Sequence, residues 1–312
     1  MNDKIERYGD VDLFRGFGIL LMVMGHVWFG DRFNLWIHAF HMPMWFIISG
    51  FFFHSNNDPK EYVTKKIRVL IVPYLFFSVG YELIWTLAKH NQWMGILFPN
   101  TIEIPLNGAL WFLPAMFFAD MFAFFVLKYI RGWARYVILA VVSIISSMHF
   151  AVLPLSIDSA LTSVGFILIG YLIKQYGNKL LELRITVSVS LLIAFSGLAF
   201  VNGIVNVRLN TYSVIPLFYV NAVGITISLW NIFKWIEKHT DLRIAKEIGA
   251  QSLLYVCANQ FILNILVRLP LPELHGMILG LWNVTEVMVI IVVCFVANRV
   301  IMKTPLKVVL GK

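Results

Sequence analysis

The chain has 312 residues, and 59% of them are hydrophobic on a count that leaves out glycine. Only 13% are charged, against roughly 25% in a soluble globular domain. A chain of this length has too little polar surface to be a soluble enzyme, and its composition also excludes disorder, collagen and coiled coil. The composition therefore predicts a polytopic membrane protein.

Apolar stretches long enough to cross a bilayer recur along the whole sequence. A helix needs about 20 mostly apolar residues to span the hydrocarbon core, with roughly 17–25 tolerated. With no long linker between them, they predict one all-α transmembrane domain over residues 1–312. On that length we expect about ten transmembrane helices, at 13–30, 35–54, 69–88, 109–127, 136–153, 159–173, 185–202, 213–233, 248–267 and 278–301.

The formal net charge of +8 contains an orientation signal. If successive spans cross the membrane in alternating directions, most of the 25 Lys and Arg residues, including Lys4 and Arg7, fall on one side of the membrane. Both chain ends fall on that same side. Because basic loops stay in the cytoplasm, both termini are predicted to be cytoplasmic, and nucleic acid is not needed to explain the charge. The basic residues on the other side are Arg32, Lys89, Arg208 and Arg268.

Ionisable side chains inside the predicted spans gather in the first two. Each costs about 2.5–3.5 kcal/mol in hydrocarbon on insertion scales, so each is a functional hypothesis. Arg15 and His26 fall on one helix face, roughly 16 Å apart along the axis. His41 lies about as far after the 31–34 turn as His26 lies before it, so the two histidines are expected at similar depth. The whole set is Arg15, His26, His38, His41, Glu82, Asp120 and Glu286, with Asp12 and Asp158 at span edges.

Pro43 lacks a backbone donor and is expected to start or kink the second helix. His41 would then lie in irregular backbone, which at membrane depth must be buried or line a wet cavity. A polar side chain such as His38 or Glu82 can also simply hydrogen-bond a neighbouring helix, and Arg15 could be a snorkelling end residue. Three histidines and an arginine on one hairpin favour a functional cavity.

A neutral histidine is the side chain best suited to take a proton from a hydroxyl near neutral pH. The sequence has no nucleophile elbow, phosphate-binding glycine loop or metal-ligand spacing. A histidine base without its own nucleophile suits transfer of a group from an activated donor onto a substrate hydroxyl. Lys65, Lys66 and Arg68 would suit phosphates on a soluble donor, although the positive-inside bias alone would also explain them.

At these residues the sequence resembles the acyltransferase-3 family of multi-pass membrane acyltransferases. The resemblance covers the whole chain and is most specific near its start. The segments that carry it are Asp12-Leu-Phe-Arg15-Gly16, Gly25-His26, Phe40-His41-Met42-Pro43, Phe46-Ile-Ile-Ser49-Gly50, Lys65-Lys66-Ile-Arg68, Val72-Pro73-Tyr74, Leu110-Trp111-Phe112, Asp158-Ser-Ala160, Gly170-Tyr171 and Gly249-Ala-Gln-Ser252-Leu253.

The resemblance implies a membrane enzyme that moves an acyl group, usually acetyl from acetyl-CoA, onto an extracytoplasmic sugar hydroxyl. By carry-over, His26 would be the catalytic base, Arg15 an essential cavity residue and His41 a lining residue of the same cavity. Asp12, three residues before Arg15, could orient the guanidinium. The residues expected on the acetyl-CoA side are Lys65, Lys66, Arg68 and Trp111.

The compact length and the Phe-His-Met-Pro segment resemble the sugar O-acetyltransferase branch of the family. The expected acceptor is a glycan or glycolipid of the capsule, exopolysaccharide or O-antigen type, with polysaccharide-assembly proteins and membrane lipids as partners and no metal. The expected location is the cell membrane, the plasma or inner membrane of a bacterium. Family members often carry a histidine in the ninth span where this chain has Asn259, so a second imidazole there is not expected.

Several alternatives stay open at the level of sequence. The acyl group could be one other than acetyl, and a transient acyl-histidine could replace direct transfer. The chain could also belong to another class of protein, a transporter or flippase for a glycolipid or small molecule. Such a protein would also have many spans and polar residues near the middle of the membrane. Transporters often show paired broken helices in corresponding halves, whereas the polar groups here gather in one hairpin.

Overall fold

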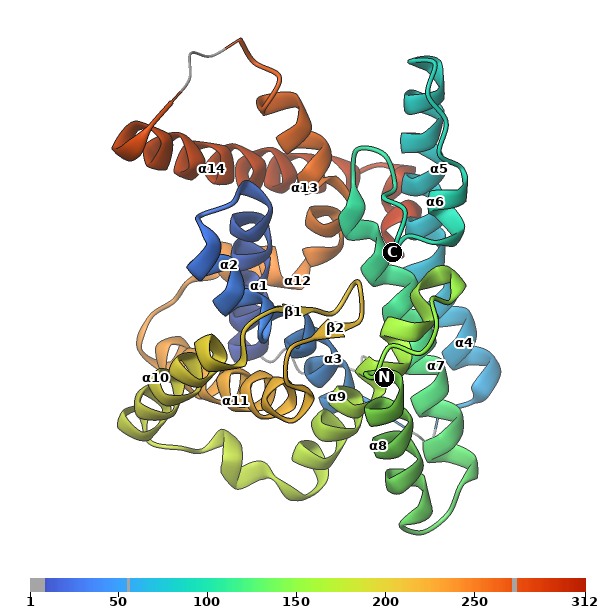
Figure 1. The fold of residues 1–312 in the computed structure, drawn as a ribbon, viewed down its shortest axis with the longest axis vertical. Helices are drawn as coiled ribbons and strands as arrows, with labels where there is room; N and C mark the ends of the chain where they lie inside the picture. The colour runs from blue at the N-terminus through green and yellow to red at the C-terminus, as the bar shows by residue number, and fades with distance from the viewer. Residues whose placement is uncertain (1–8, 55–56, 271–273) are drawn as a thin grey trace.

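The computed structural model describes residues 9–54, 57–270 and 274–312, and these residues are mostly helical (Figure 1). Two short strands, β1 (Val205–Asn206) and β2 (Thr211–Tyr212), form an antiparallel pair. The α-helices are α1 (Gly9–Val27), α2 (Asp31–His38), α3 (His41–Phe51), α4 (Pro59–Lys66), α5 (Val72–Leu87), α6 (Met94–Leu97), α7 (Phe112–Tyr129), α8 (Ala134–Ser146), α9 (Ile157–Tyr176), α10 (Ile185–Asn202), α11 (Ile215–His239), α12 (Arg243–Ala250), α13 (Ser252–Leu266) and α14 (Gly276–Ile301). The other helical turns are η1 (Ile67–Ile71), η2 (Gly108–Trp111), η3 (Pro154–Ser156), η4 (Asn178–Leu181) and η5 (Pro305–Leu310).

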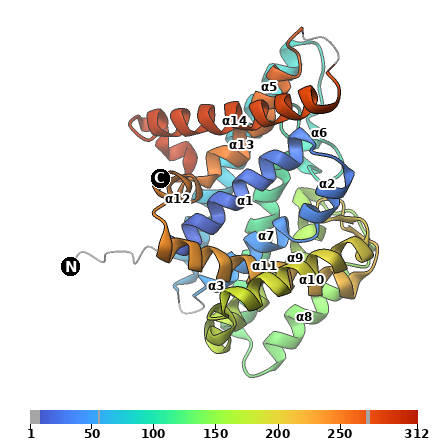
Figure 2. The same cartoon turned by 90° about the vertical axis from the view of Figure 1, so that its left-hand side faces the viewer.

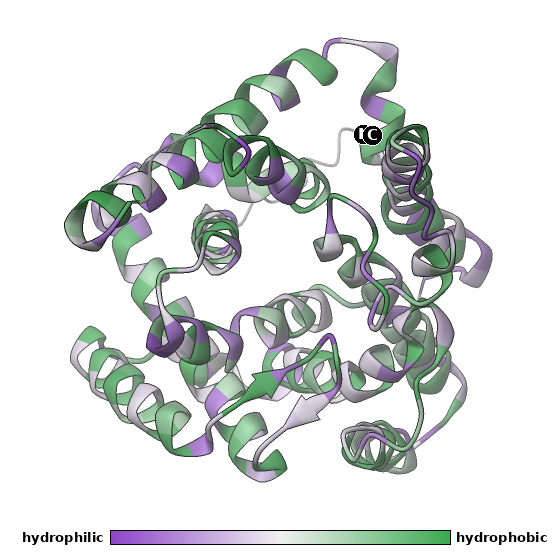
Figure 3. Cartoon of the chain, turned by 45° about the horizontal axis from the view of Figure 1, so that its top comes forward, coloured by the Kyte–Doolittle hydropathy of each residue, from purple (hydrophilic) through white to green (hydrophobic). Residues whose placement is uncertain are grey.

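The predicted class, an all-α membrane protein, is confirmed. Every predicted span overlaps a helix, and hydrophobic residues dominate the helices (Figure 3). The fifth predicted span is only 13 residues long as α8, and the ninth divides at Gln251 into α12 and α13. The count of ten crossings therefore stays a prediction. Among the described residues, six helices are long and apolar enough to cross a membrane: Pro59–Leu87, Gly108–Tyr129, Pro154–Tyr176, Ile185–Asn202, Ile215–His239 and Gly276–Ile301.

The second predicted span, 35–54, is two helices rather than one. α2 ends at His38 and α3 begins at His41. Pro43 lies in the first turn of α3, where it has no N–H to donate to the carbonyl of Ala39, so a continuous helix cannot pass through this point. The expectation that Pro43 starts or kinks the second helix is confirmed.

Two pairs of glycines let the helices that carry the site cross at close range. A Cβ added at Gly16 of α1 or at Gly249 of α12 would lie 2.2 Å or 1.8 Å from a backbone oxygen of the other helix. α3 and α9 cross in the same way at Gly50 and Gly170, where the corresponding distance is 2.0 Å. Small residues allow this close backbone approach in membranes. The four motif glycines therefore fix where α1 and α3 lie.

An aromatic cluster joins α1, α3 and α11 at the centre of the bundle. The ring of Trp230 lies 5.9 Å from that of Phe14 and 4.9 Å from that of Phe51, measured between centroids. α12 and the C-terminus lie on one side of the molecule and α2 lies on the opposite side (Figure 2). Lys4 and Arg7 of the charge count lie outside the described residues.

Candidate active site

A cavity of about 260 Å³ lies where the end of α1 meets the α2–α3 hairpin, and we call it the histidine cavity. His26 enters it from α1, and His38 and His41 enter it from the hairpin. Its other polar lining residues are Gln260 of α13, Arg208 of the β1–β2 turn, Glu103 and Asn206. The structure therefore brings together the three histidines that the sequence analysis selected, and His26 lines an interior cavity.

A second cavity of about 400 Å³ lies next to it, and we call it the basic cavity. Arg15 of α1 and Lys65 and Lys66 of α4 line it, together with the buried carboxylate of Asp120 on α7. The two cavities are adjacent, because Trp45, Phe112 and Val256 line both of them, and we call this shared stretch of wall the neck.

The neck follows from helical spacing. Trp45 lies one turn after His41 on α3, so the same face of that helix serves the histidine cavity and the neck. Ser252, Val256 and Gln260 follow one another at four-residue steps along α13 and therefore lie on one face. Ser252 lines the basic cavity, Val256 the neck and Gln260 the histidine cavity.

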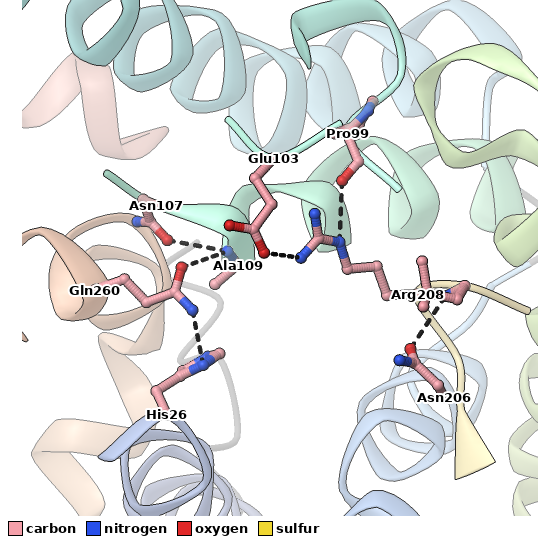
Figure 4. A network of polar contacts seen from close by, with 9 residues as sticks. His26, Pro99, Glu103, Asn107, Ala109, Asn206, Arg208 and Gln260 are labelled. Atoms are coloured by element: carbon pink, nitrogen blue, oxygen red, sulfur yellow. Dashed lines mark hydrogen bonds and ion pairs between the residues drawn. The ribbon is translucent and has the colours of Figure 1, made fainter. Parts of the chain in front are cut away.

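A chain of hydrogen bonds holds His26 in place (Figure 4). Oε1 of Gln260 accepts from the backbone N–H of Ala109 at 3.1 Å, and Oδ1 of Asn107 accepts from the same group at 3.0 Å. Nε2 of Gln260 lies 2.8 Å from Nδ1 of His26. Gln260 thus connects the imidazole to a fixed backbone amide at the start of η2.

The two hairpin histidines are held by their own helical turns. Nδ1 of His41 lies 2.8 Å from the carbonyl oxygen of Ile37, and Nδ1 of His38 lies 2.6 Å from that of Asn34. The two rings meet edge to face, with centroids 5.1 Å apart.

Arg208 closes the opposite side of the histidine cavity. Its Nε donates to the carbonyl oxygen of Pro99 at 3.1 Å, and its Nη1 donates to Oε1 of Glu103 at 3.0 Å (Figure 4). Ser159 of α9 donates to the carbonyl oxygen of Arg208 at 3.1 Å, which ties the β1–β2 turn to the bundle.

In the basic cavity the polar groups pair by charge. Nη1 of Arg15 lies 3.9 Å from Oδ1 of Asp12, so Asp12 lies where the sequence analysis expected it. Lys66 forms an ion pair with Asp120, which also accepts a hydrogen bond from Ser49 at 2.8 Å. The ammonium group of Lys66 is in direct contact with its anionic partner. The guanidinium group of Arg15 lies 3.9 Å from Asp12 and has five N–H donors, so Arg15, like Lys65, is better placed to meet a phosphate.

Two residues expected on the acetyl-CoA side do not line the basic cavity, and their roles stay predictions. Arg68 lines a separate surface depression with Lys60 and Lys65 and does not line the basic cavity. Trp111 lines the histidine cavity rather than the basic cavity. Lys65 borders both the basic cavity and this depression, whereas Arg68 reaches only the depression. Trp111 lies in η2, before α7 begins, and lines the histidine cavity.

The remaining ionisable groups of the spans have structural partners. Glu82 accepts from the backbone N–H of Gln92 at 2.6 Å, and Glu286 accepts from the indole of Trp282 at 2.8 Å. Among the described residues, His, Cys, Asp and Glu side chains form no group of three that could hold a metal ion.

Sequence reasoning missed Gln260 and Arg208. Gln260 is the neighbour of Asn259, which donates to backbone carbonyl groups of its own helix and lines neither cavity. The four-residue spacing from the motif residue Ser252 would have pointed to Gln260. Arg208 was one of the few basic residues predicted on the side of the membrane opposite the cytoplasm. That position was the only feature of the sequence that pointed to Arg208.

The fold and the site define a polytopic helical membrane protein with two adjacent cavities that both contain ionisable side chains. Residues 8–300 match the family model described as an acyltransferase domain, the acyltransferase-3 family, and the chain belongs to that family. It is therefore a membrane acyltransferase. No curated protein and no solved structure matches it significantly.

Proposed function

We propose that this acyltransferase moves an acetyl group from acetyl-CoA to a hydroxyl of a cell-surface or lipid-linked glycan in the cell membrane. The observation that carries the proposal is the pair of cavities that meet at Trp45, Phe112 and Val256. A thioester donor and an alcohol acceptor can then approach from different sides and meet at one point, which removes most of the entropic cost of bringing them together.

The basic cavity fits the donor. Arg15 and Lys65 offer cationic groups to the phosphates of CoA, and the cavity, of about 400 Å³, extends from these residues to the neck. Its wall near the neck is apolar, with Phe112 and Val256, which suits the uncharged thioester end of the donor. A guanidinium group can bind phosphate oxygens through two parallel hydrogen bonds, so Arg15 is a stronger candidate than a lysine for the first contact.

The histidine cavity fits a sugar acceptor. Trp45 and Trp111 offer broad apolar surfaces, while Glu103 and Arg208 offer an acceptor and donors for hydroxyl groups. A few placed polar groups on an otherwise aromatic wall are typical of pockets for uncharged polar ligands. An imidazole of this cavity takes the hydroxyl proton as the oxygen attacks the thioester carbon, a role that the sequence analysis assigned to His26.

The test uses the purified protein in lipid nanodiscs with acetyl-CoA labelled in its acetyl group. The acceptor is glycolipid extracted from cells that lack the protein. We expect acceptor-dependent release of CoA and a gain of one acetyl unit in the mass of the glycan. His26→Ala should abolish transfer without lowering thermal stability, while His239→Ala, at an exposed histidine, should leave transfer unchanged.

Two results would contradict the proposal. One is wild-type protein that leaves the glycan mass unchanged although it binds acetyl-CoA. The other is His26→Ala protein that acetylates as fast as wild type.

A further inference from the structure

The direction of the hydrogen bonds around Gln260 decides which nitrogen of His26 carries a proton. The backbone N–H of Ala109 can only donate, so the atom of Gln260 that lies 3.1 Å away must be the amide oxygen. The other end of the same amide is then an NH₂ group, which can only donate. It lies 2.8 Å from Nδ1 of His26. Nδ1 therefore accepts, and it carries no proton.

A neutral imidazole has one N–H, so the proton of His26 is on Nε2. Turning the amide of Gln260 around would place two donors, its NH₂ group and the N–H of Ala109, against each other. The backbone of η2 thus fixes the state of an imidazole from α1. In that state His26 presents a donor to the histidine cavity, and its basic nitrogen is already engaged.

The hairpin histidines have the opposite arrangement. The carbonyl oxygen of Ile37 can only accept, so Nδ1 of His41 donates to it and carries the proton. Nε2 of neutral His41 is then an unprotonated, basic nitrogen. It makes no hydrogen bond to another described residue and is not among the fully buried unpartnered atoms, so it is open to the cavity.

His38 is bonded in the same way to Asn34, but its position differs. His41 begins α3 and lies one turn from Trp45 at the neck, where the thioester would arrive. His38 ends α2 on the far side of the break and is less buried than His41. His41 is therefore the basic nitrogen nearer to the meeting point of the two substrates.

We propose that His41 is the catalytic base of the acetyl transfer, that His26 is a hydrogen-bond donor to the thioester oxygen, and that Gln260 is the positioning residue that sets His26 in this state. The inference rests on the proposed function and departs from the sequence-based assignment of the base to His26. The geometry behind it is the contrast between the Gln260–His26 and Ile37–His41 hydrogen bonds.

The transfer proceeds through a tetrahedral intermediate. The acceptor oxygen attacks the thioester carbon, a C–O bond forms, and the hydroxyl proton moves to Nε2 of His41. Negative charge develops on the thioester oxygen, and the N–H of His26 stabilises it. The tetrahedral intermediate collapses with cleavage of the C–S bond, and the proton on His41 passes to the leaving sulfur. The products are the acetylated glycan and CoA with a free thiol.

The first experiment compares glutamine substitutions, because glutamine keeps an N–H donor but is not a base. His41→Gln should lower turnover by about 10²–10⁴-fold, the usual contribution of a general base. His26→Gln should retain at least about tenfold more turnover than His26→Ala, since a single donor of this kind is worth about 10²–10³-fold. His239→Gln, at an exposed histidine with the same bond to its own helix, is the matched control and should be unchanged.

His38→Gln is measured alongside, and it should retain more turnover than His41→Gln. Any other ranking overturns the inference. A His41→Gln enzyme that turns over like wild type, a His26→Gln enzyme no better than His26→Ala, or a loss confined to His38→Gln would each do so.

The second experiment reverses the hydrogen bond at Gln260. In Gln260→Glu one carboxylate oxygen can still accept from Ala109, while the other can only accept from His26, which moves the ring proton to Nδ1. Transfer should fall about as far as in His26→Ala, with the KM for acetyl-CoA unchanged. If His26 were the base, the same change would present its basic nitrogen to the substrate, and transfer would match or exceed wild type. Gln175→Glu, at an exposed glutamine of α9, is the control.

A spectroscopic measurement separates this inference from the proposed function. Nitrogen-15 NMR of histidine-labelled protein in lipid distinguishes the two neutral forms of the ring, and loss of one signal in His26→Gln assigns it. We expect the proton of His26 on Nε2 and that of His41 on Nδ1. A proton on Nδ1 of His26 overturns the inference even if the protein acetylates glycans. Wild-type protein that releases no CoA overturns the proposed function instead.

Discussion

The two cavities hold their polar side chains in different ways. In the histidine cavity, His26, His41 and Arg208 are tied, directly or through Gln260, to backbone amides and carbonyls, and Arg208 also pairs with the largely exposed carboxylate of Glu103. In the basic cavity, Lys66 is tied to the carboxylate of another side chain. Backbone groups fix the direction of each hydrogen bond and hence the position of each proton, whereas ion pairs fix only the balance of charge. The first arrangement suits proton transfer, and the second suits holding an anionic donor.

The largest effect on stability is expected at Asp120, because its buried carboxylate forms the ion pair with Lys66 in the basic cavity. Asp120→Ala would leave the partly buried ammonium group of Lys66 without its partner. Removing one partner of a buried ion pair lowers the free energy of unfolding by about 3–5 kcal/mol. Thermal unfolding in detergent measures the loss. Glu247→Ala breaks a pair with Arg299 that is largely exposed, and it should cost no more than about 1 kcal/mol. Equal losses in the two variants would show that Lys66 does not depend on Asp120.

The crossing that holds Arg15 beside the neck should be nearly as sensitive. Gly249→Ala places a Cβ 1.8 Å from a backbone oxygen of α1, and overpacking of this kind costs about 1–3 kcal/mol. Gly280→Ala on α14 is the control, because nothing lies within 4 Å of its added Cβ. We expect the melting temperature to fall in the first variant and to stay the same or rise in the second. A Gly249→Ala protein as stable as wild type would mean that α1 and α12 do not cross so closely.

The smallest effects separate the two cavities by substrate. Lys65→Ala should raise the KM for acetyl-CoA by about two- to fivefold with little change in kcat, because one exposed phosphate contact is worth at most about 1 kcal/mol. Arg68→Ala should change it less, since Arg68 lies outside the basic cavity. Arg208→Gln should raise the KM for the glycan and leave that for acetyl-CoA unchanged. Steady-state kinetics with each substrate varied in turn measures both KM values. If Lys65→Ala raised the KM for the glycan and Arg208→Gln raised that for acetyl-CoA, the two cavities would have the opposite roles.

Local sequence predicted much of the fold because hydropathy and proline act over short distances. The apolar segments, the break before Pro43 and the pairing of Asp12 with Arg15 each depend on residues within a turn or two of one another. A similar depth of His26 and His41 was predicted from their equal distances to the connecting turn, and the structure shows that both histidines line one cavity. The motif glycines were recognised by resemblance, and the structure supplies their reason at the helix crossings.

By itself, the sequence of this protein determined that it is a helical membrane acyltransferase with histidines gathered near one hairpin, since composition, periodicity and motifs are local properties. Only the tertiary structure decided that Gln260 contacts His26 from 234 positions away, and that Lys66 is neutralised by Asp120. It also decided that Trp111 and Arg68 lie outside the basic cavity. Such contacts depend on how far each helix is rotated and shifted against its neighbours, and that is set by packing over the whole bundle.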